Sequence, residues 1–278
     1  VPGFSVQPSE LAKIALPLAM AWFLRHRKTI RQAGGLLAPL VMMAVPVGLI
    51  LILPDLGTAL LFPLVLYAML IGAGARFRHL VLVAVIALLM LPGAYPLLRP
   101  YQKGRIKTLI YQATGMLTAQ EKQTLRQGGA YQQYQSLTAT GSGGLVGQGP
   151  DGSMHLREGL LPEAHNDFVF AVVGTQWGFL GDACVLLLYL AFYGAALEIA
   201  GSTRDPFARL TAVGLGSLVM FQAFINMAMT MGLAPVVGIA LPFLSYGGSS
   251  LLTNMAAAGI LLNISIRRDG LRMAPMPA

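Results

Sequence analysis

Between Arg209 and Arg267 the chain reads LTAVGLGSLVMFQAFINMAMTMGLAPVVGIALPFLSYGGSSLLTNMAAAGILLNISI, residues 210–266, without one charged side chain. A helix that spans a bilayer needs roughly 20 mostly apolar residues. This stretch is too long for one crossing and fits two, over 207–231 and 249–266. The Pro- and Gly-rich segment between them breaks helix, and irregular backbone is tolerated at membrane depth only where protein buries it or it lines a cavity. We therefore expect residues 232–248 to form a re-entrant or packed outer loop.

The composition of the whole chain agrees with a membrane environment. Of its 278 residues, 55% are hydrophobic and 11% are charged, against about 25% charged in a typical soluble domain. This excludes an ordinary soluble enzyme, a disordered tail and a disulfide-stapled secreted module. The single cysteine, Cys184, allows neither an intramolecular disulfide nor a thiolate metal site. The net charge of +8 sits in short clusters between apolar stretches, as in cytoplasmic membrane loops, so we expect no nucleic-acid partner.

Charge-free gaps elsewhere predict five more crossings. These lie over 11–24 (extended back through Lys13 and Glu10), 32–54, 56–75, 79–98 and within 170–199. Basic residues follow the first, third, fifth and seventh crossings, and the positive-inside rule places that side in the cytoplasm. The sequence thus predicts an all-α polytopic membrane protein of about seven transmembrane helices in a single domain, 1–278.

The remaining loops then lie outside the cell membrane. The N-terminus, the turn at Asp55 and residues 99–167 are extracytoplasmic, and the C-terminus is cytoplasmic. Residues 99–167 form the one sizeable polar stretch, a large extracytoplasmic loop of a length that is usually functional or disordered. Its Gly-rich GSGGLVGQG at 141–149 has the composition of a phosphate cradle, but no GK[ST] follows, so it matches no P-loop.

The loop ends in LPEAHNDFVFA, residues 161–171, where Asp167 comes directly before an apolar run. One interpretation is an acid at a helix N-terminus, which the helix dipole favours. The other is a partly desolvated carboxylate at the outer membrane boundary that can exchange protons. Both can hold at once. Glu163 and His165 are close enough in sequence to influence Asp167 or to stay solvated, and the four histidines are too scattered for a zinc site.

Three further charges fall inside predicted crossings or at their ends. Glu10 and Lys13 are three residues apart, on one face of a helix, and charges at membrane depth pair or face a polar cavity. They predict either an interfacial ion pair, with Lys13 extended toward water, or a cavity role. Asp55 is placed to cap the helix that begins at Leu56 or to face the same cavity. Ser249 is one of four hydroxyl-bearing residues within 245–250.

Five motifs follow one another along the chain: QPSELAK at 7–13, PDLGTAL at 54–60, YQ at 131–132 followed by QS and GSGG, LPEAHNDFVFA at 161–171, and GLAPVVGIALPFLSYGGSSLL at 232–252. In this order and spacing they strongly resemble the SEDS proteins, the RodA/FtsW family of shape, elongation, division and sporulation. The likeness runs from Gln7 to about Arg268. It departs from the family pattern at Asn166, where Thr is usual, and at 175–176, where an acidic pair is common.

The resemblance implies a ten-helix fold of which the seven predicted crossings are the fourth to the tenth, so that the chain lacks the first three. It implies a multi-pass enzyme of the bacterial cytoplasmic (inner) membrane, a peptidoglycan glycosyltransferase for cell-wall elongation and shape or for division. We expect the RodA-like role. Such enzymes polymerise lipid II, an undecaprenyl-pyrophosphate-linked disaccharide, at the outer face of the membrane with a class B penicillin-binding protein.

The resemblance also implies roles for single residues. The family's essential aspartate maps onto Asp167, the expected general base, and its cavity residues map onto Glu10, Lys13 and Asp55. The developing charge of the pyrophosphate leaving group calls for cationic side chains or a divalent cation, Mg²⁺ or Mn²⁺. Lys13 and Arg105 are the candidates, and no organic cofactor is expected. An α-linked donor and a β-1,4 product imply inversion, without a covalent glycosyl-enzyme.

Two other functions remain open on the sequence. A lipid II flippase would use the broken helix near 235–248 and the intramembrane charges of Glu10 and Lys13. A non-catalytic scaffold would recruit a penicillin-binding protein. The predicted position of Asp167 outside, where polymerisation takes place, favours the glycosyltransferase.

Overall fold

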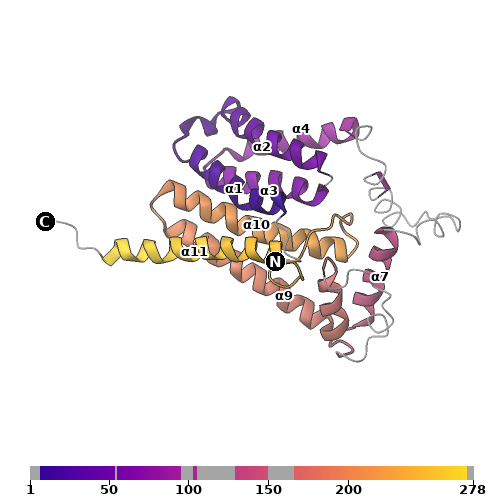
Figure 1. Cartoon of the computed structure of the whole chain (residues 1–278). Coiled ribbons are helices and arrows are strands. Elements are labelled where there is room, and N and C mark those ends of the chain that lie inside the picture. The colour runs from indigo at the N-terminus through magenta and orange to yellow at the C-terminus, as the bar shows by residue number, and fades with distance from the viewer. Residues whose placement is uncertain (1–6, 54, 95–102, 105–128, 150–165, 274–278) are drawn as a thin grey trace. The chain divides into compact units, whose positions relative to one another are not determined.

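The computed structural model describes residues 7–53, 55–94, 103–104, 129–149 and 166–273, and every regular element in them is a helix (Figure 1). The all-α class predicted from the sequence is confirmed for this part of the chain. The elements are α1 (Pro8–Leu24), η1 (Lys28–Arg31), η2 (Ala33–Leu36), α2 (Leu37–Ile52), α3 (Leu56–Gly72), α4 (Phe77–Ala94), α7 (Gly129–Ser142), α9 (Val169–Ser202), α10 (Pro206–Thr230) and α11 (Gly248–Met273).

Four helical stretches of the described chain are long and apolar enough to cross a membrane. They are Gly34–Ile52, which contains α2, then α9, α10, and Gly248–Arg267 of α11. The apolar helices Leu56–Gly72 and Phe77–Ile86 are shorter, and α1 has 17 residues. The protein is therefore a multi-pass membrane protein, while the count of seven crossings and the side on which each loop lies stay predictions.

The outer face of α2 shows why these helices require lipid. Leu37, Val41, Val45 and Leu49 recur every four residues, and each is more than half exposed. Leaving such a row in water costs roughly 25 cal/mol for each Å² of apolar surface. The hydrocarbon of a bilayer removes that cost, so this face is suited to contact lipid tails.

The described helices belong to two compact units of the chain. Unit 1 contains residues 1–84, 189–222 and 247–278, and unit 2 contains residues 85–188 and 223–246. Both α9 and α10 are shared: the first part of α9 and the last part of α10 belong to unit 2. The single domain expected over 1–278 stays a prediction.

Unit 1 packs its helices closely at small residues. In it α1 contacts α2, α3 and α11, and α2 contacts α3. A Cβ added at Gly214 of α10 would lie 2.9 Å from the Sδ of Met69 in α3 and 3.1 Å from the Cβ of Pro17 in α1. The absence of a side chain at this glycine thus lets three helices meet.

In unit 2 the Gly-rich segment 141–149 packs against a break in α9. Gly178 has φ 67° and ψ −163°, and it interrupts the helix inside the crossing predicted within 170–199. Four backbone hydrogen bonds of 2.9–3.1 Å join the two segments: Gln148 N to Thr175 O, Gly149 N to Gln176 O, Phe179 N to Gly144 O and Leu180 N to Leu145 O. They satisfy backbone groups that the break frees, as membrane depth requires.

The glycines of this segment are needed for that contact. A Cβ added at Gly143 would lie 1.9 Å from the carbonyl oxygen of Gly174, and one at Gly147 would lie 2.1 Å from that of Gln176. The amides at 148 and 149 already donate to α9. The motif is therefore a packing element for α9 and not a phosphate cradle.

The C-terminal end of α10, also in unit 2, is held by α7. The side-chain amide of buried Gln133 donates to the carbonyls of Met229 (3.0 Å) and Ala234 (2.8 Å). Ser136, from the QS of the third motif, donates to the carbonyl of Thr230 at 3.0 Å. Gly232, with φ 73°, then ends the helix in a Schellman turn. The last carbonyls of α10 thus have partners within the protein.

Residues 231–247, which follow α10, contain no regular helix. Val236, Val237, Ile239 and Leu241 of this connecting segment are at most 6% exposed. These four apolar side chains are thus packed within the protein, and the position of the segment in the membrane stays a prediction.

Candidate functional site

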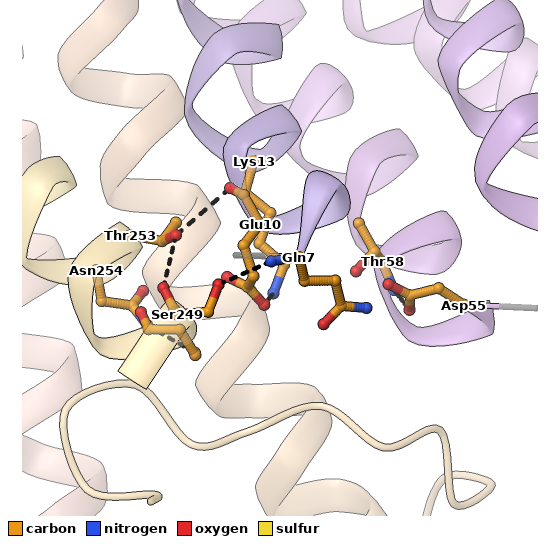
Figure 2. Close-up of polar contacts among 9 residues, drawn as sticks. Gln7, Glu10, Lys13, Asp55, Thr58, Ser249, Thr253 and Asn254 are labelled. Atoms are coloured by element: carbon orange, nitrogen blue, oxygen red, sulfur yellow. Dashed lines mark hydrogen bonds and ion pairs between the residues drawn. The ribbon is translucent and has the colours of Figure 1, made fainter. Parts of the chain in front are cut away.

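The sequence-predicted residues that the structure describes, apart from Asp55, fall into two polar clusters, one in each unit. The α1 cluster, in unit 1, consists of Gln7, Glu10, Lys13, Ser249 and Thr253 (Figure 2). The Asp167 cluster, in unit 2, consists of Asp167, Asn226, Gly238 and Ile239. The remaining predicted residues, Arg105, Glu163 and His165, lie outside the described residues.

The centre of the α1 cluster is a buried ion pair. The ammonium of Lys13 donates to Oε1 of Glu10 at 2.5 Å, one helical turn away on α1, and the two residues are 3% and 8% exposed. The interfacial interpretation predicts that Lys13 extends toward water, whereas in the structure Lys13 is buried. Removing one partner of such a pair would leave an uncompensated buried charge, which is strongly destabilising.

The start of α11 lies against this pair. Ser249 Oγ accepts the backbone N–H of Gln7 at 3.3 Å, and Thr253 Oγ1 donates to the carbonyl of Ser249 at 3.0 Å. Thr253 Oγ1 also lies 3.5 Å from the carbonyl oxygen of Glu10. Glu10 Oε2 is buried without a hydrogen-bond partner in the described part of the chain. The cluster thus has one carboxylate oxygen left to accept a hydrogen bond.

Asp55 has the capping role that was one of its two predicted alternatives. Its carboxylate accepts the backbone N–H of Thr58 at 3.0 Å and so caps α3, an interaction typically worth about 1 kcal/mol. Figure 2 draws both residues at the start of α3. Within the described chain, Asp55 forms no ion pair with Lys13.

In the Asp167 cluster one buried amide holds two backbone segments together. Asn226 of α10 is fully buried, and its Nδ2 donates to the carbonyl of Asp167 at 2.8 Å and to that of Ile239 at 2.7 Å. Asp167, two residues before α9, is thereby fixed to the connecting segment 231–247. Asn226 Oδ1 is buried and has no hydrogen-bond partner among the described residues.

The carboxylate of Asp167 lies beside a glycine. Asp167 is half-buried, and its Oδ2 is 3.5 Å from the position that a Cβ would take on Gly238. Gly238 has φ 72° and is exposed, so both its backbone and its surroundings favour the absence of a side chain. Position 238 therefore places no side chain against this oxygen of Asp167.

Sequence reasoning missed Thr253 and Asn226, although a signal for both was present. Each is a polar residue inside the charge-free stretch 210–266, and polar groups buried in apolar helices need a partner. It also missed the environment of Asp182, which is buried in α9 with Oδ1 unpartnered among the described residues.

The structure gives no protein-built metal site in the residues it describes. No three histidine, cysteine, aspartate or glutamate side chains gather there. A hard cation such as Mg²⁺ commonly takes one or two carboxylates and completes its shell with substrate phosphates and water. A single carboxylate such as Asp167 fits that kind of site only together with a phosphate-bearing substrate.

Comparison with known proteins identifies the family. The family model for FtsW, RodA and SpoVE, described as "Cell cycle protein", matches residues 1–270. The chain belongs to this family. The resemblance inferred from the five motifs is thus confirmed.

Named relatives cover most of the chain. It is 39% identical over 271 residues to the probable peptidoglycan glycosyltransferase FtsW of Geobacter metallireducens, covering 97% of this chain and 69% of the relative. It is 37% identical over 267 residues to stage V sporulation protein E of Bacillus subtilis, covering 95% and 70%. It is 35% identical over 263 residues to the peptidoglycan glycosyltransferase MrdB of Escherichia coli K12, covering 94% and 68%.

Solved structures agree with this family. A chain from a peptidoglycan synthase complex that coordinates polymerisation and crosslinking matches with a TM-score of 0.77 and 29% identity, over 96% of this chain and 72% of that one. The rod shape determining protein RodA of Thermus thermophilus matches with a TM-score of 0.62 and 28% identity, over 96% and 68%.

Proposed function

We propose that this family member is a peptidoglycan glycosyltransferase that polymerises lipid II at the outer face of the bacterial inner membrane. Relatives at 35–39% identity carry that enzyme name. The observation that carries the assignment in this chain is Asp167: a half-buried carboxylate whose backbone is held by Asn226 and which borders the side-chain-free Gly238. Orientation across the membrane follows from the positive-inside rule.

The proposed step is a general-base displacement. A sugar hydroxyl is a weak nucleophile, and Asp167 takes its proton as the oxygen attacks the anomeric carbon of the donor. The bond from that carbon to the pyrophosphate breaks, and the undecaprenyl pyrophosphate leaves with the electron pair. A positioned base contributes about 10²–10⁴-fold. Attack opposite to an α-linked leaving group gives a β-linkage in one inverting step.

We also propose that Lys13 binds a pyrophosphate of lipid II and that Glu10 holds the Lys13 side chain in position. An ammonium has three N–H donors, and the salt bridge to Glu10 uses one of them. A divalent cation, Mg²⁺ or Mn²⁺, would neutralise further pyrophosphate charge when bound. Arg105, Glu163 and His165 are assigned supporting roles on the sequence alone, and Ser249 holds the entry to α1 through Gln7.

Two carboxylates on or beside α9 give a matched test. The full-length protein, purified with a class B penicillin-binding protein, is assayed for glycan chains from lipid II as Asp167→Asn and as Asp182→Asn. We expect a loss of at least about 100-fold for Asp167→Asn, because the base is removed, and near wild-type polymer for Asp182→Asn. Equal activity of the two variants would remove Asp167 as the base.

A lipid II flippase is the second candidate, because a buried ion pair in an apolar helix is the kind of feature that marks transport paths. Flipping of lipid II in liposomes separates the two. If Asp167→Asn abolishes polymer and leaves flipping untouched, the enzyme assignment stands. If no variant or wild-type preparation makes polymer while the penicillin-binding protein still binds, a scaffold role replaces it.

The proposed cellular role is elongation and shape. The chain matches a relative named FtsW at 39% identity and one named MrdB at 35% identity. Similarity alone therefore does not distinguish a role in elongation from a role in division. Expression of the full-length gene in strains depleted of one or the other enzyme decides it. Restored rod shape supports elongation, and restored septation alone would assign division instead.

A further inference from the structure

Unit 1 contains a pocket that the proposed polymerase activity does not use. It has a volume of about 610 Å³ and lies where the end of α1, the end of α3 and the start of α10 meet. Five basic side chains line it, namely Arg25, His26, Arg27, Arg31 and Arg209. The other lining residues are leucine, alanine and proline, so the wall carries no acid.

The positive charge of this basic pocket is not compensated within the described protein. None of its five basic side chains forms an ion pair with an acid of the described chain. Asp205 directly precedes the lining residue Pro206, but both of its carboxylate oxygens cap α10. They accept hydrogen bonds from the backbone amides of Phe207 (3.2 Å) and Ala208 (3.1 Å). Four guanidinium groups gathered around one pocket repel one another, and a bound anion relieves that repulsion.

Two of the arginines are held by aromatic rings. The guanidinium carbon of Arg25 lies 5.3 Å from the ring centre of Trp22, and that of Arg27 lies 4.3 Å from the ring centre of Phe23. A guanidinium over a ring face keeps its N–H edge available, and that planar edge matches the oxygens of a phosphate. The pocket therefore presents donors of the geometry that a phosphodiester accepts.

The position of Trp22 indicates at which depth of the membrane the pocket lies. It is 62% exposed and lies one turn before Arg25, at the end of α1. Tryptophan with one exposed face is typical of the headgroup layer, where its ring is both apolar and polar. A pocket at that depth meets lipid headgroups before it meets solutes of the aqueous phase.

We propose that this basic pocket binds the headgroup of an anionic phospholipid of the cytoplasmic leaflet. Basic pockets between transmembrane helices on that side take anionic headgroups in this way. The proposal uses the positive-inside orientation and does not depend on the glycosyltransferase assignment. The phosphate of the headgroup sits among the guanidinium groups, and its acyl chains follow the exposed apolar faces of the helices.

The experiment compares two pairs of arginines with the same charge. Full-length protein in phosphatidylcholine nanodiscs is titrated with phosphatidylglycerol, and bound lipid is counted by native mass spectrometry. Arg25→Gln/Arg209→Gln removes two pocket charges. Arg76→Gln/Arg78→Gln removes two exposed charges, one just before α4 and one in its first turn, outside the pocket lining.

We expect wild type and Arg76→Gln/Arg78→Gln to retain phosphatidylglycerol in preference to phosphatidylcholine. We expect Arg25→Gln/Arg209→Gln to bind it at least about 25-fold more weakly, since each guanidinium that bonds the phosphate directly contributes at least roughly five-fold. Equal losses in both pairs would show diffuse surface attraction and overturn the pocket. Thermal unfolding in phosphatidylcholine alone checks that the variants are folded.

Competition tests the source of the phosphate. Inorganic phosphate that displaces phosphatidylglycerol at low millimolar concentration would identify a soluble anion and contradict the lipid assignment. Displacement by a polyglutamate peptide would identify a protein segment and contradict it as well. Retention of the lipid against both supports the proposal.

Discussion

Glu10 in unit 1 and Asp167 in unit 2 are both acids at the ends of apolar helices, yet the protein treats them in opposite ways. Glu10 is 8% exposed and has its charge neutralised by Lys13 on the same helix. Asp167 is half-buried, and Asn226 fixes its backbone carbonyl. The difference teaches that a buried ion pair suits a stabilising and orienting role, whereas a partly exposed carboxylate on a held backbone suits chemistry.

The largest expected effect on stability is at the ion pair. Lys13→Met leaves Glu10 as a buried charge without its partner, and we expect a loss of about 3–5 kcal/mol in the free energy of unfolding. Glu10→Gln/Lys13→Met removes both charges and should recover most of it. Thermal unfolding in detergent measures both. A Lys13→Met protein as stable as wild type would contradict the comparison for unit 1.

The same double variant separates structure from substrate binding. If it is stable but polymerises lipid II poorly, with a raised KM, Lys13 contacts substrate in addition to its structural role. If its kinetics are those of wild type, the pair is structural alone and the proposed pyrophosphate contact is removed.

The next effect sharpens the comparison at Asp167. Gly238→Ala adds a methyl group about 3.5 Å from Asp167 Oδ2, and we expect polymerase activity to fall by about ten-fold if that space admits substrate, the effect of misplacing reacting groups. Gly144→Ala is the control, because Gly144 also has positive φ (59°) but no atom within 4 Å of the added group.

Both alanine variants carry the backbone cost of a left-handed residue, about 1–2 kcal/mol. Loss of activity in Gly238→Ala alone is therefore not explained by stability. A similar loss in both would mean that Gly238 is required for its backbone and not for the space beside Asp167.

The smallest effect is expected at Asp182, a buried carboxylate within α9. It is 9% exposed, and its Oδ1 has no hydrogen-bond partner in the described part of the chain. An unsatisfied buried oxygen costs about 1–3 kcal/mol. Asp182→Asn removes the charge, and we expect a gain of up to about 1 kcal/mol, measured by thermal unfolding. A loss of stability would show that the carboxylate has a role in the fold.

Much of the helical arrangement was predictable because charge and apolar length mark membrane helices directly. The expected 207–231 and 249–266 correspond to α10 at Pro206–Thr230 and α11 at Gly248–Met273. The cap at Asp55 was one of the two alternatives predicted for an acid placed directly before an apolar run. An ion pair between Glu10 and Lys13 was one of two alternatives that their spacing allowed, but their burial was not predictable, because α11 packs against this part of α1.

Other features depend on contacts that local pattern does not contain. The break at Gly178 is compatible with helix only because the segment 141–149, some distance away in sequence, supplies backbone partners. Asn226 is an ordinary polar residue in its own helix, and its role exists only through the carbonyls of Asp167 and Ile239.

That one amide has a mechanical consequence. The side-chain NH₂ group of Asn226 has two hydrogens, and each is donated to a different backbone segment. Neither segment can move far from Asn226 without breaking its hydrogen bond. The segment carrying Gly238 and the residue ahead of α9 must therefore travel together. A ligand that moves the segment carrying Gly238 therefore displaces Asp167 directly, through the two hydrogen bonds of Asn226 and not through the length of a helix.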